Sequence, residues 1–192
     1  PIFMQTIMLK LRSWAFRVTN TWQWSSIIVP FIATRLAWIL IALFARGNLP
    51  VNPTYAEYAQ RGYFLSRFFL IDIWSHWDGR WYFSIAKHGY VPPAEITGSF
   101  SNLAFFPLYP YLVRATGWLG LPLPDSVLIL WGVLLSNLFF LAAAMLLHQI
   151  ATDHLGFTPN QARRALVLLF AFPSAFFFSC FYPESLFLFL AV

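Results

Sequence analysis

The chain has 192 residues, of which 59% are hydrophobic and only 10% are charged, and its formal net charge is +5. Soluble domains carry about a quarter charged residues, so this composition excludes an ordinary water-soluble globular protein. The basic residues are spread along loops and form no continuous stripe, so the positive charge does not indicate a nucleic-acid partner.

Long apolar runs predict an all-α integral membrane protein, a multi-span helical bundle that forms one polytopic domain over residues 1–192. The expected spans are at about 27–46, 126–150, 165–181 and 186 onward. Residues 1–25 mix basic residues with tryptophans and form the approach to the first span. A cleaved signal peptide is disfavoured there, because the run is long and no A-x-A-like site follows it. The chain starts without methionine and stops inside an apolar run, so we expect the N-terminal part of a longer protein.

The first two spans are separated by a long external loop, residues 47–125. Most of it is too polar to cross a membrane, and several prolines interrupt it. We expect short amphipathic helices that lie in the membrane interface, at residues 55–73, at 78–88 and from Pro107 onward.

The stretch 74–90 holds most of the polar chemistry of this loop. Asp78 is predicted to cap a short helix, because an aspartate side chain accepts hydrogen bonds from the first free backbone N–H groups. Gly89 is predicted to end that helix. At helical spacing the polar side chains share one arc, formed by Arg80, Ser84, Lys87 and His88. The apolar and aromatic side chains share the other arc, which is expected to face the membrane: Trp81, Tyr82, Ile85 and Ala86.

The distribution of basic residues predicts the orientation of the chain. Residues 1–25 and 151–164 both carry basic residues and are two spans apart, so the positive-inside rule assigns both to the cytoplasm. The external loop and the turn at Glu184 then share the opposite side. Asp78 and Glu184 are therefore expected to face the same compartment.

A carboxylate beside basic and aromatic residues at a membrane surface suits transfer of a sugar from a lipid phosphate. Asp78 would be the general base that takes the proton of an acceptor hydroxyl. Basic side chains would stabilise the phosphate charge as the bond breaks, and aromatic rings would contact the sugar or the polyprenyl chain. The candidates for substrate binding in this stretch are Trp77, Arg80, Tyr82, Lys87 and His88. Side chains suffice for a leaving group with one phosphate, and no cluster has metal-ligand spacing, so no metal or other cofactor is expected.

The same residues also have structural interpretations. Asp78 alone before a helix is most often only a cap, and the basic residues would then only contact lipid phosphates. Glu184 would cap the fourth span, and Asp72, a second acid, has apolar neighbours and ranks below Asp78. Arg35 lies inside the first span, where a charge is costly unless it is paired. For Arg35 a structural pair with a polar group on a neighbouring helix is favoured over binding of an anionic head group.

Three segments resemble the PIG-V-type family, the GPI mannosyltransferase II group with its bacterial relatives, and their order and spacing also match. They are Trp77–Tyr90 (WDGRWYFSIAKHGY), Ala104–Arg114 (AFFPLYPYLVR) and Phe172–Phe187 (FPSAFFFSCFYPESLF). The resemblance implies a GT-C-type membrane glycosyltransferase that uses a polyprenyl- or dolichyl-phosphate sugar, typically mannose, on the non-cytoplasmic side. It implies that Asp78 is the catalytic acid and that Glu184 belongs to the site, although Pro183 stands where threonine is more usual.

The expected acceptor is a hydroxyl group of a glycan, a glycolipid or a protein. The expected location is the bacterial plasma membrane, or the ER membrane in a eukaryote. Two other function classes stay open. A transporter or flippase would use Arg35 and Asn137 as polar sites within the membrane, and a non-enzymatic scaffold would bind a partner through the external loop.

Overall fold

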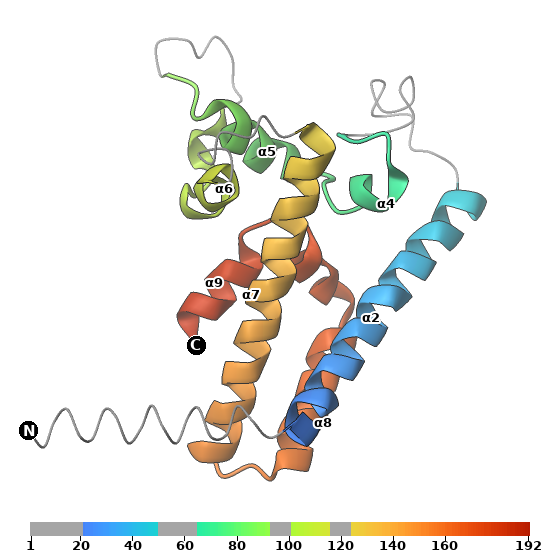
Figure 1. Ribbon diagram of the computed structural model, residues 1–192, viewed down its shortest axis with the longest axis vertical. Coiled ribbons are helices and arrows are strands. Elements are labelled where there is room, and N and C mark those ends of the chain that lie inside the picture. Colours follow the sequence, from blue (N-terminus) through green and yellow to red (C-terminus); the bar gives the residue numbers. More distant parts are fainter. Residues whose placement is uncertain (1–20, 50–64, 93–100, 116–123) are drawn as a thin grey trace, which may run out of the picture.

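The computed structural model describes residues 21–49, 65–92, 101–115 and 124–192, and these are helical or irregular, without a β-strand. Two long helices dominate, α2 (Thr21–Asn48) and α7 (Asp125–Asp153), as Figure 1 shows. Both are long and apolar enough to cross a membrane, over Ser25–Asn48 and Asp125–Asp153. The expected all-α membrane fold class is confirmed. Of the predicted approach in residues 1–25, residues 1–20 lie outside the described residues, and residues 21–25 begin α2.

A third possible crossing is broken in the middle. Helix α8 (Pro159–Ala171) begins with a capping box between Thr158 and Gln161, and the 3₁₀ helix η4 (Pro173–Ser179) follows it. The two axes differ by 83°. Phe172 is extended (φ −63°, ψ 134°), because the residue before a proline is disfavoured in the helical region. The predicted interruption at Pro173 is therefore present, and it is a sharp bend.

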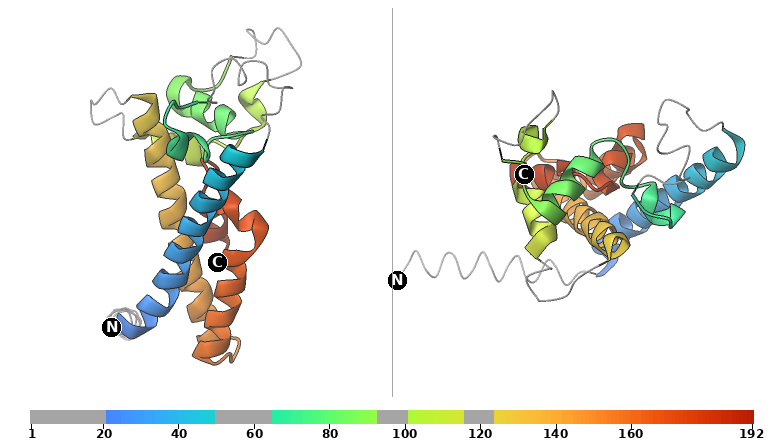
Figure 2. Two further views of the ribbon diagram at one scale, coloured as in Figure 1. Left: turned by 90° about the vertical axis from the view of Figure 1, so that its right-hand side faces the viewer. Right: turned by 90° about the horizontal axis from the view of Figure 1, so that it is seen from above.

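Four short helices gather at one end of the molecule, next to the first residues of α7 (Figure 1). They are α4 (Phe69–Asp72), α5 (Gly79–His88), η2 (Asn102–Ala104) and α6 (Leu108–Arg114). The start of α2 and the α7–α8 connection lie at the other end, and Figure 2 gives the same arrangement from two further sides. The helix predicted at 78–88 is present as α5. Of the helix predicted at 55–73, residues 55–64 lie outside the described residues, and the rest contains only the single turn α4.

The core that supports this end is built around the turn between η4 and α9 (Glu184–Ala191). Phe181 is fully buried, and its ring packs directly on the backbone of α7 at Gly132. The aromatic face of α5 packs against α6 and this turn, through contacts such as Tyr82 with Tyr109 and Phe83 with Phe181. That face therefore contacts protein, whereas the sequence predicted contact with the membrane interface.

Candidate active site

Asp78 immediately precedes α5, and its carboxylate makes no capping hydrogen bond. The expectation that Asp78 caps this helix through its side chain is therefore wrong. Asp78 already has helical backbone angles (φ −71°, ψ −13°), whereas a capping residue is normally extended, which aims its side chain at the free N–H groups. Its backbone carbonyl starts the helix instead, by accepting from the N–H groups of Trp81 and Tyr82. The side chain of Asp78 is exposed.

The residue before it, Trp77, has a left-handed backbone conformation (φ 52°). Trp77 is 55% exposed, and its ring lies beside the rings of His76 and Phe177, at centroid distances of 6.1 and 5.9 Å. The chain turns here because the N–H of Gly79 donates to the carbonyl of His76 at 3.1 Å. An exposed aromatic face and an exposed carboxylate therefore project from one tight turn.

The turn between η4 and α9 holds the Asp78 loop in place through hydrogen bonds. The N–H of Phe181 donates to the carbonyl of Trp74 at 2.7 Å. The hydroxyl of Tyr182 accepts from the N–H of Asp78 at 2.9 Å and donates to the carbonyl of His76 at 2.9 Å. These contacts fix the Asp78 loop to a segment more than 100 residues later in the chain.

Glu184 begins α9 directly after this turn and lies within the electrostatic range of Asp78. Burial raises the pKa of the Glu184 carboxyl group, its own backbone N–H lowers it, and the charge of Asp78 raises it further. One carboxylate oxygen, Oε2, is buried without a hydrogen-bond partner among the described residues. A buried carboxylate oxygen of this kind can accept a hydrogen bond from a hydroxyl group of a substrate.

Tyr82, a predicted substrate-binding residue, is only 7% exposed. Its ring makes perpendicular contacts with the rings of Phe105 and Tyr109, so it packs within the protein. Burial raises the pKa of Tyr82 to about 12, and the charges of Glu184 and Asp78 add to this effect. Its side chain therefore lies in the electrostatic range of both carboxylates, beneath the surface that they form.

The three predicted cations of α5 differ in their surroundings. Lys87 forms an ion pair with Asp125 at 2.7 Å and ties the end of α5 to the start of α7. Arg80 is exposed, with its guanidinium 5.0 Å from the centre of the Trp81 ring. His88 is exposed in the last turn. Within the described residues no cation forms an ion pair with Asp78 or Glu184, so neither Arg80 nor His88 bridges the two carboxylates.

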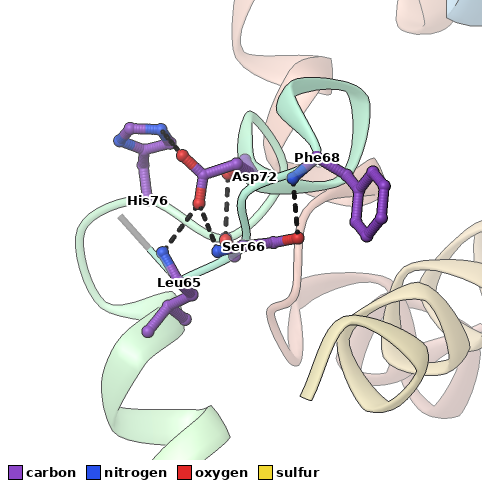
Figure 3. Close-up of polar contacts among 6 residues, drawn as sticks. Leu65, Ser66, Phe68, Asp72 and His76 are labelled. Carbon is purple, nitrogen blue, oxygen red and sulfur yellow. Dashed lines mark hydrogen bonds and ion pairs between the residues drawn. The ribbon is translucent and has the colours of Figure 1, made fainter. Parts of the chain in front are cut away.

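The second acid of the loop, Asp72, has a structural role (Figure 3). Its Oδ1 accepts from the N–H groups of Leu65 and Ser66 at 2.7 and 2.9 Å, and its Oδ2 lies 3.6 Å from Nε2 of His76. Asp72 is 2% exposed. A buried carboxylate that accepts two backbone N–H groups stabilises the folded loop. Within the described residues, no three His, Cys, Asp or Glu side chains gather closely enough to hold a metal ion.

Arg35 lies deeper in the molecule, at the break between α8 and η4. Its guanidinium donates to the Ser179 hydroxyl at 2.6 Å and to the carbonyls of Phe170 and Ala175 at 3.1 and 3.3 Å. Ser179 in turn donates to Oδ1 of Asn137 at 2.8 Å. These contacts support the structural interpretation of Arg35. Its guanidinium donates to two backbone carbonyls and a hydroxyl at the break between α8 and η4.

The structure thus gathers Asp78, Glu184, Trp77, Arg80 and the buried Tyr82 at one end of the molecule. Lys87 and His88 lie at the far end of α5, and Arg35 belongs to a separate cluster. Sequence reasoning missed Tyr182. Its position in the YPES turn gave no signal that its hydroxyl contacts a loop more than 100 residues earlier.

Comparison with known proteins adds an independent observation. The model of the family described as mannosyltransferase (PIG-V) matches residues 56–192. A GPI mannosyltransferase 2 of Drosophila pseudoobscura pseudoobscura is 34% identical over 119 residues, which are 59% of this chain and 25% of that protein. One from Drosophila melanogaster is 30% identical over 171 residues, 81% of this chain and 36% of that protein. The human GPI alpha-1,6-mannosyltransferase 2 is 33% identical over 118 residues, 59% of this chain and 22% of that protein. The chain thus spans about a quarter to a third of these relatives, and no solved structure matches it.

Proposed function

The chain belongs to the PIG-V mannosyltransferase family, and on this premise we propose that it carries the catalytic end of a membrane mannosyltransferase. The donor is a polyprenyl- or dolichyl-phosphate sugar, and the acceptor is a hydroxyl group of a glycan, glycolipid or protein. The reaction takes place on the non-cytoplasmic side of the membrane. The curated relatives named as GPI mannosyltransferases support mannose as the sugar.

The observation that carries this proposal is the state of the Asp78 carboxylate. It is exposed and makes no capping bond, although it lies on a turn fixed from below by Tyr182. A carboxylate with no structural task in the described part of the chain is free to accept a proton from a substrate hydroxyl. Glu184 supplies a second carboxylate beside it.

In the proposed reaction the acceptor oxygen attacks the anomeric carbon of the sugar, and its proton passes to Asp78. The bond between that carbon and the phosphate oxygen breaks, and the lipid phosphate leaves with the bonding electrons. Arg80, exposed in the first turn of α5, stabilises the developing phosphate charge. His88, at the far end of α5, also stabilises this charge. The exposed ring of Trp77 contacts the sugar, and Oε2 of Glu184 accepts from a sugar hydroxyl.

Lys87 contributes less directly than the sequence predicted, because Asp125 already neutralises it. Exposed pairs of this kind are worth about 1 kcal/mol or less, so a phosphate group can compete with Asp125 for the Lys87 ammonium group. A transporter would need free polar groups within the membrane, but Arg35 and Asn137 are joined through Ser179. This network favours the transferase.

Substitution of Asp78 by asparagine tests the proposal. The change keeps the size of the side chain and removes no capping bond, so the fold should persist. Loss of the general base should lower turnover by about 10²- to 10⁴-fold. The assay follows transfer from polyprenyl-phosphate mannose in membranes that contain the protein as it occurs in the cell. Asp153→Asn, an exposed aspartate at the other end of α7, is the matched control. Near-normal transfer by a well-expressed Asp78→Asn protein would end the proposal.

A further inference from the structure

The hydroxyl of Tyr182 occupies a specific place between two backbone groups of the Asp78 loop. It accepts from the N–H of Asp78 and donates to the carbonyl of His76, each at 2.9 Å. A phenol has one proton to donate and lone pairs that accept, so one hydroxyl satisfies both backbone groups. The residue between these two groups is Trp77.

Trp77 needs such support because of its backbone conformation. A φ of 52° is uncommon for a residue with a Cβ atom, especially a bulky one. Conformations of this kind persist only where the surroundings hold them in place. Here the support acts on both sides of the strained residue, because the hydroxyl contacts the carbonyl before Trp77 and the N–H after it.

The side chain of Tyr182 is itself held by packing. Tyr182 is 5% exposed, and its ring packs against Tyr82 and Phe177 at centroid distances of 5.9 and 5.8 Å. Its carbonyl accepts from the hydroxyl of Ser136 on α7 at 3.2 Å. Tyr182 therefore links the Asp78 loop to the long helix α7.

We infer that Tyr182 is a positioning residue for Asp78: its hydroxyl holds the strained Trp77 turn so that the Asp78 carboxylate keeps its place. The inference rests on the proposed function, in which Asp78 is the base. A displacement of a catalytic group by about 1 Å costs on the order of 10²-fold in rate. Loss of the hydroxyl should therefore affect the chemical step and leave the binding of the donor largely intact.

Tyr182→Phe removes a single oxygen atom and keeps the packed ring. We expect a fall in kcat of about 10- to 100-fold with an unchanged KM for the lipid-phosphate sugar. The matched control is Tyr90→Phe, since the hydroxyl of Tyr90 also donates to a backbone carbonyl, that of Phe105. This control should keep kcat within about threefold of the unaltered protein, because its hydroxyl does not contact the Asp78 loop.

A double-mutant cycle separates positioning from general damage. In an Asp78→Asn background, Tyr182→Phe should cause no further loss of the residual rate, since the group that it positions is already absent. A further loss of similar size in that background would mean that Tyr182 only stabilises the fold, and would overturn the inference. An unchanged kcat for the folded Tyr182→Phe protein would overturn it as well.

The cycle also separates this inference from the proposed function. If Asp78→Asn keeps transfer, the proposed function fails, whatever Tyr182→Phe does. If Asp78→Asn is inactive and Tyr182→Phe is normal, only the role of Tyr182 fails. Should Tyr182→Phe not fold, Ser136→Ala keeps the phenol and weakens its anchor, and kcat should fall with an unchanged KM. A folded Ser136→Ala protein with normal kcat would then overturn the inference.

Discussion

Glu184 lies close enough to Asp78 for the charge of Asp78 to raise the pKa of the Glu184 carboxyl group, in addition to the larger effect of burial. The two residues of this pair are 106 positions apart in the chain. Tyr182, two residues before Glu184, contacts the backbone of Asp78 directly. The loop and the turn therefore form one unit, and the pKa of Glu184 depends on the charge of Asp78.

The raised pKa predicts how Glu184 affects stability as the pH changes. Between the ordinary carboxyl value of 4.5 and the raised value, the folded protein binds the Glu184 proton more tightly than the unfolded chain. Stability is then lost as the pH rises through this window. Glu184→Gln, which stays neutral, should raise Tm above the window and change it little at pH values below 4.5. Thermal unfolding in detergent over a pH series measures this difference.

The contribution of Asp78 to this effect is separable. In an Asp78→Asn background one of the causes of the raised pKa is absent, so the gain from Glu184→Gln should be smaller at the same pH. A gain that is independent of pH would show that the substitution acts through packing and would contradict the electrostatic explanation.

Arg35 predicts a second effect on stability. Arg35→Met would leave the Ser179 hydroxyl and the carbonyls of Phe170 and Ala175 without the donor that they have now. A buried polar group without a partner costs about 1–3 kcal/mol, so the loss should exceed about 2 kcal/mol. In a protein of this size that is a fall in Tm of at least roughly 4 °C. Arg35→Lys should recover only part of it, because lysine lacks the planar fork.

Arg46 lies in the last turn of α2, the helix that also contains Arg35, and it is the control for this prediction. Its guanidinium lies 4.4 Å from the centre of the Phe69 ring and is exposed. Arg46→Met should therefore cost about 1 kcal/mol or less. Equal losses from Arg35→Met and Arg46→Met would contradict the view that Arg35 holds the break between α8 and η4.

Gly132 predicts the cost of disturbing the packing beneath the site. A Cβ atom at this position would lie 2.2 Å from Cε2 of Phe181, and the Phe181 ring is fully buried. Gly132→Ala should destabilise the protein by about 1–3 kcal/mol, the usual cost of overpacking. Gly47→Ala in α2 meets no atom within 4 Å and should be neutral or stabilising by up to about 1 kcal/mol. Unfolding in denaturant compares the two.

Local patterns predicted much of this architecture. Apolar length placed α2 and α7, helical spacing separated the buried face of α5 from Arg80, Lys87 and His88, and Pro173 marked the bend after α8. These features depend on neighbouring residues, so a single sequence contains them.

Contacts between residues far apart in the chain could not be predicted from such local patterns. The hydroxyl of Tyr182 binds groups 104 and 106 residues away, and no local spacing encodes that pairing. The capping prediction for Asp78 had the correct residue type, but side-chain capping depends on backbone angles that the surrounding turn sets. The same holds for Asp72, whose carboxylate binds the N–H groups of Leu65 and Ser66 through the shape of the loop.

The last prediction concerns the orientation in the membrane. The exposed residue Leu155 lies in the connection between α7 and α8, and the exposed Pro92 lies just after α5. These positions belong to opposite ends of the molecule (Figure 1). Cysteines at the two positions should therefore react with an impermeant maleimide from opposite sides of the membrane. The background is Cys180→Ala, which removes the one native cysteine.

The positive-inside rule assigns the connection that precedes Arg163 and Arg164 to the cytoplasm. Pro92→Cys should then be labelled in intact cells or sealed ER vesicles only from the non-cytoplasmic side. Leu155→Cys should be labelled there only after permeabilisation, and equal labelling of both in detergent controls for reactivity. Labelling of both from one side would contradict the two-ended fold. Labelling from opposite sides in the reverse order would keep the fold but move the site to the cytoplasm, which would refute the non-cytoplasmic reaction proposed for Asp78.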